Sequence, residues 1–164
     1  MRKLAAIGAA LAVLGGTTAA VSVASASAAP TSAAEPSVKV LHLISHDTSV
    51  KIVDIGKKGT SPGDELIETT IDFQHGVQVD RSVVNCVLIT IIGHAMDVLC
   101  HGDLAFKDGQ VQFQGETNFH TPFTLAVTGG TGAYQNAGGQ LTLLRTLPNG
   151  NDVETLRLVF FETG

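Results

Sequence analysis

The sequence is poor in aromatic and basic residues, and these shortages exclude several classes of binding protein. It contains no tryptophan, and aromatic residues make up 5% of the chain. Ten Lys and Arg residues are outnumbered by fifteen Asp and Glu residues, and past the N-terminus no basic cluster stands out beyond Lys57-Lys58. The sequence therefore argues against a base-stacking platform, a lectin-type sugar site and a surface for nucleic acid or anionic membranes.

Metal-binding and hydrolase motifs are also missing. The two cysteines, Cys86 and Cys100, do not form a Cys-x-x-Cys pair. His42 and His46 are four residues apart on a predicted strand and can share a face, but no third ligand has suitable spacing. A Gly-x-Ser-x-Gly nucleophile elbow is absent. We therefore predict no metal site and no cofactor.

The N-terminus has the pattern of a secretory signal peptide. Arg2 and Lys3 precede an uncharged stretch of small and apolar residues, which ends at the cleavage motif Ala26-Ser27-Ala28. The alternative, a retained membrane anchor, is disfavoured because a lasting span needs about 20 strongly apolar residues. We expect a signal peptide (1–28), a flexible lead-in (29–36) and one domain (37–164), located outside the cell and free of the membrane after cleavage.

Helical periodicity is nearly absent, whereas strand patterns recur between turn residues. The first predicted strand has a candidate break near His46-Asp47. Short turns force neighbouring strands to be antiparallel, and such strands bury a face as a sandwich or a closed barrel. The eight predicted strands are 38–54, 65–74, 77–92, 95–106, 110–116, 122–128, 140–147 and 152–162.

The two cysteines fit a disulfide across one hairpin. If Cys86 and Cys100 are directly opposed, the chain reverses in a three-residue loop centred on Gly93, and opposed residues are close enough for a disulfide. Two cysteines in an exported chain favour this pairing over a reactive thiol.

This register also predicts which residues share the interior face of that hairpin. Val87, Ile89 and Ile91 would then point outward as an apolar stripe, which is either a subunit interface or a surface covered by a loop or the lead-in. The predicted interior residues are Cys86, Leu88, Ile92, Met96, Val98, Leu104 and Phe106.

Three segments resemble the allene oxide cyclase and dirigent family of small β-barrels. They are Ser61-Pro-Gly-Asp64, Cys86-Val-Leu-Ile89 and Leu125-Ala-Val-Thr-Gly-Gly-Thr-Gly132-Ala-Tyr134. The resemblance decides between the two all-β architectures: it implies a closed, eight-stranded, antiparallel up-and-down barrel. We interpret Gly129, Gly130 and Gly132 as a structural turn, since no helix pattern or lysine supports a phosphate-binding loop.

The resemblance implies a ligand pocket inside the barrel but assigns no catalytic residues. His42 falls where plant allene oxide cyclases have the first residue of a Glu-x-Asn motif, Thr70 where they have an Asn, and Cys86 where they have a barrel cysteine. The family's Glu and both Asn residues are therefore not retained. His42 also has a simpler interpretation, as a core histidine satisfied by one hydrogen bond.

The family members steer the closure or coupling of an apolar substrate held in the barrel. We therefore expect a secreted barrel that binds a small apolar molecule and can steer its cyclisation or isomerisation. The alternative is a non-catalytic binding or structural barrel. Asp72, Asp97 and Arg157 are available as counterparts of the buried acids and Arg of dirigent proteins. Because plant members are trimers, the resemblance also implies a homo-oligomer, a trimer or dimer.

Overall fold

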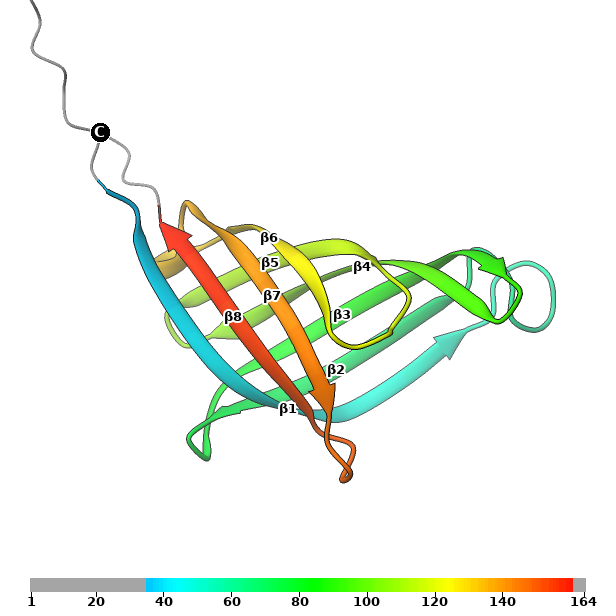
Figure 1. Cartoon of the computed structure of the whole chain (residues 1–164), viewed down its shortest axis with the longest axis horizontal. Helices are drawn as coiled ribbons and strands as arrows, with labels where there is room; N and C mark the ends of the chain where they lie inside the picture. Colours follow the sequence, from blue (N-terminus) through cyan, green and yellow to red (C-terminus); the bar gives the residue numbers. More distant parts are fainter. Residues whose placement is uncertain (1–34, 161–164) are drawn as a thin grey trace, which may run out of the picture. The chain divides into compact units, whose positions relative to one another are not determined.

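Eight antiparallel strands follow one another around a closed barrel, in which β1 pairs with both β2 and β8 (Figure 1). The computed structural model describes residues 35–160. The expected closed, eight-stranded antiparallel barrel is confirmed. Its elements are β1 (Ser37–Val53), β2 (Glu65–Gln74), β3 (Val77–Ile92), β4 (Ala95–Phe106), β5 (Gly109–Thr117), β6 (Phe123–Gly130), the 3₁₀ turn η1 (Gly132–Tyr134), β7 (Ala137–Thr146) and β8 (Asp152–Phe160).

The strand boundaries follow the turn residues of the sequence. β2, β3 and β4 begin and end where the pattern predicts, because His75-Gly76 and Gly93-His94 supply tight turns, in which all residues but His94 have a positive φ. The candidate break in β1 is a register shift between Asp47 and Ser49 within one continuous strand. β7 begins three residues earlier than predicted, since Ala137 already pairs with Phe160 of β8.

The glycine-rich turn between β6 and β7 packs against the β4–β5 turn. Gly132 has a φ of 59°, and a Cβ there would collide with the carbonyl oxygen of Asp108. A Cβ on Gly130 would lie 2.5 Å from the carbonyl oxygen of Tyr134. Gly129 has neither constraint, so the predicted need for special backbone angles holds for Gly132 alone.

The barrel interior is apolar on one side and polar on the other. The inward positions of β4 to β7 are mostly apolar, whereas those of β2, of the first half of β3 and of the first half of β8 carry acids and hydroxyls. The fully buried side chains are Leu43, Leu104, Leu156, Leu158, Val111, Asp72 and Cys100.

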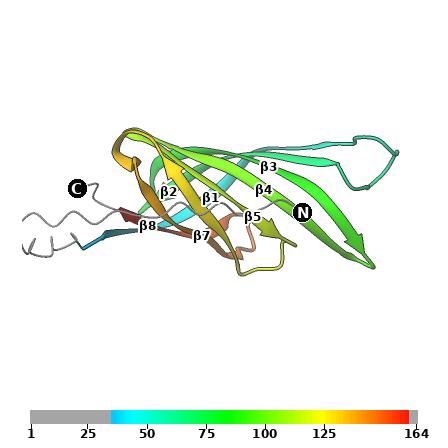
Figure 2. The same ribbon diagram turned by 90° about the horizontal axis from the view of Figure 1, so that it is seen from above.

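The β3–β4 hairpin extends beyond the barrel (Figure 2). The register places Cys86 opposite Cys100 as predicted, but it shifts between Leu88 and Thr90, so the loop has two residues instead of three. The shift turns Ile92 away from the predicted interior face, and its side chain is 71% exposed. Met96 keeps the face of Val98, but it lies near the end of the projecting hairpin and is 42% exposed, so it is not enclosed by the barrel as predicted. Ile91 now pairs with Met96 and shares its face, so its predicted outward direction is wrong.

The predicted signal peptide and residues 29–34 of the lead-in lie outside the described residues, as do residues 161–162 of the last predicted strand. Within residues 35–160, no helix is long and apolar enough to cross a membrane.

Candidate functional site

A cavity of about 190 Å³ lies inside the barrel and has two chemically different walls. The apolar wall comes mainly from β4 to β7 and the β5–β6 loop, and the polar wall from β1, β2, β3 and β8. The apolar wall consists of Val84, Leu104, Phe113, Phe119, Phe123, Leu125, Leu141 and Leu143, with the disulfide-bonded Cys86 and Cys100. The polar wall consists of Ser45, Glu68, Thr70, Ser82, Asp152 and Glu154, with Thr121 and Thr146 at its edge.

Two of the three predicted pocket residues line this cavity. Thr70 and Cys86 do so, whereas His42 lies on the outer face of β1, where its Nδ1 is 3.3 Å from Thr155 Oγ1. The predicted interior position of His42 is therefore wrong. Both faces of β1 are apolar near its start, so alternation could not identify the inward face. Pairing with β8 decides it, by turning Leu41 and Leu43 inward.

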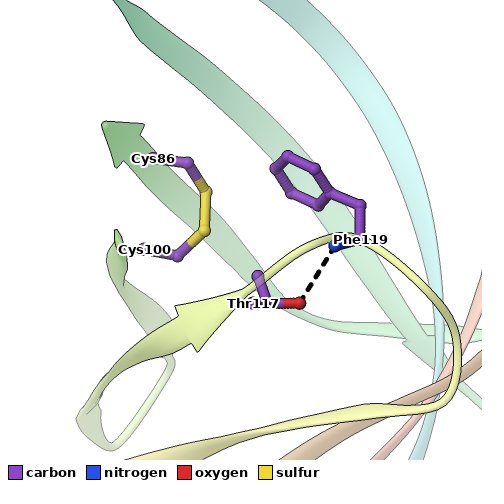
Figure 3. The surroundings of a disulfide bond; sticks show 4 residues. All are labelled: Cys86, Cys100, Thr117 and Phe119. Carbon is purple, nitrogen blue, oxygen red and sulfur yellow. Dashed lines mark hydrogen bonds between the residues drawn. A yellow bond between two sulfur atoms is a disulfide. The ribbon is translucent and has the colours of Figure 1, made fainter. Parts of the chain in front are cut away.

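The predicted disulfide is present and forms part of the cavity wall (Figure 3). Cys86 and Cys100 are almost fully buried, with their Cα atoms 4.0 Å apart. Phe119 lies on the β5–β6 loop, which follows β5, and its backbone N–H donates a hydrogen bond to Thr117 Oγ1 at 3.1 Å. The disulfide and Phe119 thus line the cavity from different elements.

The carboxyl groups of the polar wall hold their protons unusually tightly. Burial is the main cause that raises the pKa of both Glu68 and Glu154 to about 8, and neighbouring acids, Asp47 and Asp72 among them, add to the effect. Burial also raises the pKa of Asp152, against the opposing effect of a 2.6 Å hydrogen bond from Thr146 Oγ1. Near neutral pH, Glu68 and Glu154 are therefore mostly protonated and can donate hydrogen bonds into the cavity.

A buried pair of acids, Asp72 and Asp80, lies beyond the cavity on β2 and β3. The two residues are directly opposed, and neither oxygen of an ionised Asp80 would have a hydrogen-bond donor. Burial, followed by the adjacent Asp72 carboxyl, raises the pKa of Asp80 to about 9. The pair therefore holds a proton at neutral pH, as closely spaced carboxyl groups do.

Two hydroxyls connect this pair to the cavity. Thr70 Oγ1 donates to Asp72 Oδ1 at 3.2 Å, and Thr70 Oγ1 and Ser82 Oγ are 2.6 Å apart. Because Thr70 uses its hydrogen on Asp72, Ser82 must donate to Thr70. The lone pairs of Ser82 Oγ therefore remain available as acceptors on the cavity wall.

Sequence reasoning named Asp72 but missed the other interior acids. The missed inward acids are Glu68, Asp80, Asp152 and Glu154. Alternation could have placed such residues together on one face of a strand, since Glu68, Thr70 and Asp72 occupy every second position of β2, but it could not tell that this face is the inner one. Asp97 and Arg157 do not line the cavity, and Arg157 is exposed on the outer face of β8. Within the described residues, no Lys, Arg or His lines the cavity, and no cluster of three or more acids, histidines or cysteines could hold a metal ion.

Several solved structures are similar to this barrel, and enzymes that act on small molecules are among them. A pyocyanin demethylase shares 28% sequence identity over 73% of this chain and 99% of its own, with a TM-score of 0.64. A heme-binding cyclase that catalyses a [4 + 2] cycloaddition in neoabyssomicin biosynthesis shares 18% identity over 80% of this chain and 70% of its own, also with a TM-score of 0.64.

A dirigent protein is similar to the same degree. The pterocarpan synthase dirigent protein GePTS1 shares 17% identity over 78% of this chain and 93% of its own, with a TM-score of 0.62. The sequence matches no protein-family model and no curated protein. At these identities the cyclase and the dirigent protein establish a common fold and leave the reaction to be argued from the cavity.

Proposed function

We propose that this chain, which has the barrel fold of the dirigent and allene oxide cyclase-like family, binds a small apolar molecule with a hydrogen-bonding edge and steers its cyclisation or isomerisation. Export after removal of residues 1–28 belongs to the same proposal. It is supported by the disulfide, since disulfides form and persist in oxidising compartments. The solved neighbours include cyclases and dirigent proteins.

One observation carries the proposal: a wall of aromatic and aliphatic side chains faces carboxyl groups with raised pKa values across a single cavity. The apolar wall would hold a flexible substrate in a folded shape. Binding would then supply the entropy cost of bringing the reacting atoms together, which lowers the barrier to ring closure. A neutral Glu154 or Glu68 would donate a hydrogen bond to a substrate carbonyl oxygen and stabilise negative charge that develops there in the transition state.

The proposal predicts a specific response to two substitutions of Glu154. The probes are linear molecules with a conjugated diene and a tethered enone, whose ring closure is followed by chiral chromatography. Glu154→Leu removes the donor and is expected to lower the catalysed rate about 100-fold. Glu154→Gln keeps an N–H donor that does not ionise, so its rate should stay constant above pH 8, where the parent loses activity as Glu154 ionises.

Glu116→Gln, on an exposed position of β5, serves as the matched control and should behave as the parent. If the probes bind but close at the uncatalysed rate to racemic product, the barrel is the non-catalytic binding protein that is the alternative.

We also propose that the chain self-associates, as a trimer or dimer, through the outer face of β3 and β4. Val83 and Leu99 are 39% and 48% exposed on this face, and an interface would bury these apolar side chains. Val83→Asp combined with Leu99→Asp is expected to reduce the mass measured by light scattering to that of one chain. Val77→Asp, at a 66% exposed position at the start of β3, should leave the mass unchanged. A monomeric parent at micromolar concentration would contradict this proposal.

A further inference from the structure

An apolar groove adjoins the barrel cavity at the end from which the β3–β4 hairpin projects. It has a volume of about 220 Å³ and is formed by β1, the loop before β2, and the strands β2, β3 and β4. Most of its lining is aliphatic. The groove residues are Ile52, Thr60, Asp64, Glu65, Leu66, Cys86, Leu88, Met96, Val98 and Phe119.

Cys86 and Phe119 line both the groove and the cavity, so the two hollows meet at these side chains. Phe119 stands in the β5–β6 loop on the same side of the barrel as the disulfide, and its side chain is 41% exposed (Figure 3). Its φ of 61° is in the left-handed region, which is costly for a bulky residue. The hydrogen bond to Thr117 and the edge-on contact with Phe123, at 6.4 Å between ring centres, help to hold it there.

The volumes indicate why a ligand would use both hollows. Pockets for drug-sized molecules commonly measure about 300–1,000 Å³. The cavity, at about 190 Å³, falls below this range, whereas the cavity and groove taken together reach it. A molecule that fills the cavity would thus extend past Phe119 onto the aliphatic side chains of the groove.

We propose that the cavity and the groove form one elongated site for an amphipathic molecule, with its polar end at the polar wall of the cavity and its apolar tail in the groove. This inference rests on the proposed function and names the shape and polarity of its ligand. The polar end is uncharged or cationic, because acids line both hollows while no Lys, Arg or His among residues 35–160 does so. A ligand carboxylate at that end would be repelled by any ionised acid of the cavity. Beside neutral acids, it would be buried without a positively charged partner.

The test uses 4-alkylphenols, whose hydroxyl can form a hydrogen bond with the polar wall while the alkyl tail is lengthened from two to eight carbons. Affinities are measured by isothermal titration calorimetry at pH 7. Once the tail reaches the groove, each added methylene is expected to lower the Kd about fourfold. Met96→Glu places a charge in the groove at a 42% exposed position and is expected to abolish this gain, without changing the Kd of 4-ethylphenol.

Ile92→Glu is the matched control, because Ile92 belongs to the same hairpin, does not line the groove and is 71% exposed. It should keep the parent's gain per methylene. Alkanoic acids of matched length should bind at least tenfold more weakly than the phenols; equal affinity would contradict the assigned polar end.

The outcomes separate this inference from the proposed function. If short and long phenols bind and Met96→Glu keeps the gain per methylene, the tail does not use the groove, while binding in the barrel cavity stands. If the folded parent binds none of the phenols, the elongated site and the proposed binding function both fail.

Discussion

Raising the pH from 5 to 9 is expected to lower the free energy of unfolding of the barrel, and Asp80→Asn is expected to remove a large part of this loss. Asp80 is 4% exposed, and its pKa is raised to about 9, mainly by burial. In the unfolded chain its pKa returns to about 3.8. Between these values the folded state keeps a proton that the unfolded state has released.

The sign of the effect follows from that difference in bound protons. Because the folded state binds more protons, stability falls as pH rises, by about 1.4 kcal/mol per pH unit for a single group within the window. Asn cannot ionise, so the variant does not undergo the decrease in stability that Asp80 contributes. The raised pKa values of Glu68 and Glu154 act in the same direction, so some pH dependence remains.

Thermal unfolding followed by circular dichroism at pH 5, 7 and 9 measures this effect. The Tm of the parent should fall across the series, and the Tm difference between Asp80→Asn and the parent should widen. Glu116→Gln, an exposed acid on β5, should track the parent at every pH. If parent and Asp80→Asn lost stability in parallel, Asp80 would not hold its proton in the folded state.

Removing the disulfide with Cys86→Ala and Cys100→Ala is expected to lower the free energy of unfolding by about 3 kcal/mol. The bond closes a segment with a sequence separation of 14 and so restricts the unfolded chain. For a domain of this size, the loss corresponds to a Tm decrease on the order of 10 °C. The two sulfurs are also buried in the core, and their replacement by smaller side chains removes packing.

Unfolding in urea, with the parent measured in the presence and absence of reductant, separates the two contributions. The fully reduced parent lacks the cross-link and should therefore lose most of the stability that the double variant loses. Its loss should be somewhat smaller, because its sulfur atoms still fill the core. A thiol count on the unfolded parent should give no free thiols before reduction. Two free thiols, or a double variant as stable as the parent, would show that the bond does not stabilise this barrel.

Some interior positions could be predicted from local sequence, and others could not. Cys86, Leu88, Val98 and Leu104 lie inside as expected, because pairing of the two cysteines fixes the register of the hairpin near the disulfide. Beyond Leu88, the register shift reverses the two faces of β3, and no pattern in the sequence predicts this shift. His42 was misassigned because β1 has apolar residues on both faces, so only its pairing with β8 determines which face is inside.

The buried acids of the barrel interior depend most on the closed fold. Asp72 and Asp80, on neighbouring strands, lie far from Glu154 in the sequence, and all three look like ordinary surface acids of amphipathic strands. Barrel closure turns them inward together, and the low polarity of the interior then raises the pKa of Asp80 and Glu154. Alternation could assign them to a face of a strand, but it could not tell which face closure would bury.

The sequence by itself determined the number of strands, their short antiparallel connections and the cysteine pairing, because turn residues and two-residue alternation act locally. Only the tertiary structure decided which face of β1 is buried, where the hairpin leaves the barrel, and that acids meet an aromatic wall in one cavity. These features depend on pairing between strands and on closure between β1 and β8, which couple residues more than a hundred positions apart.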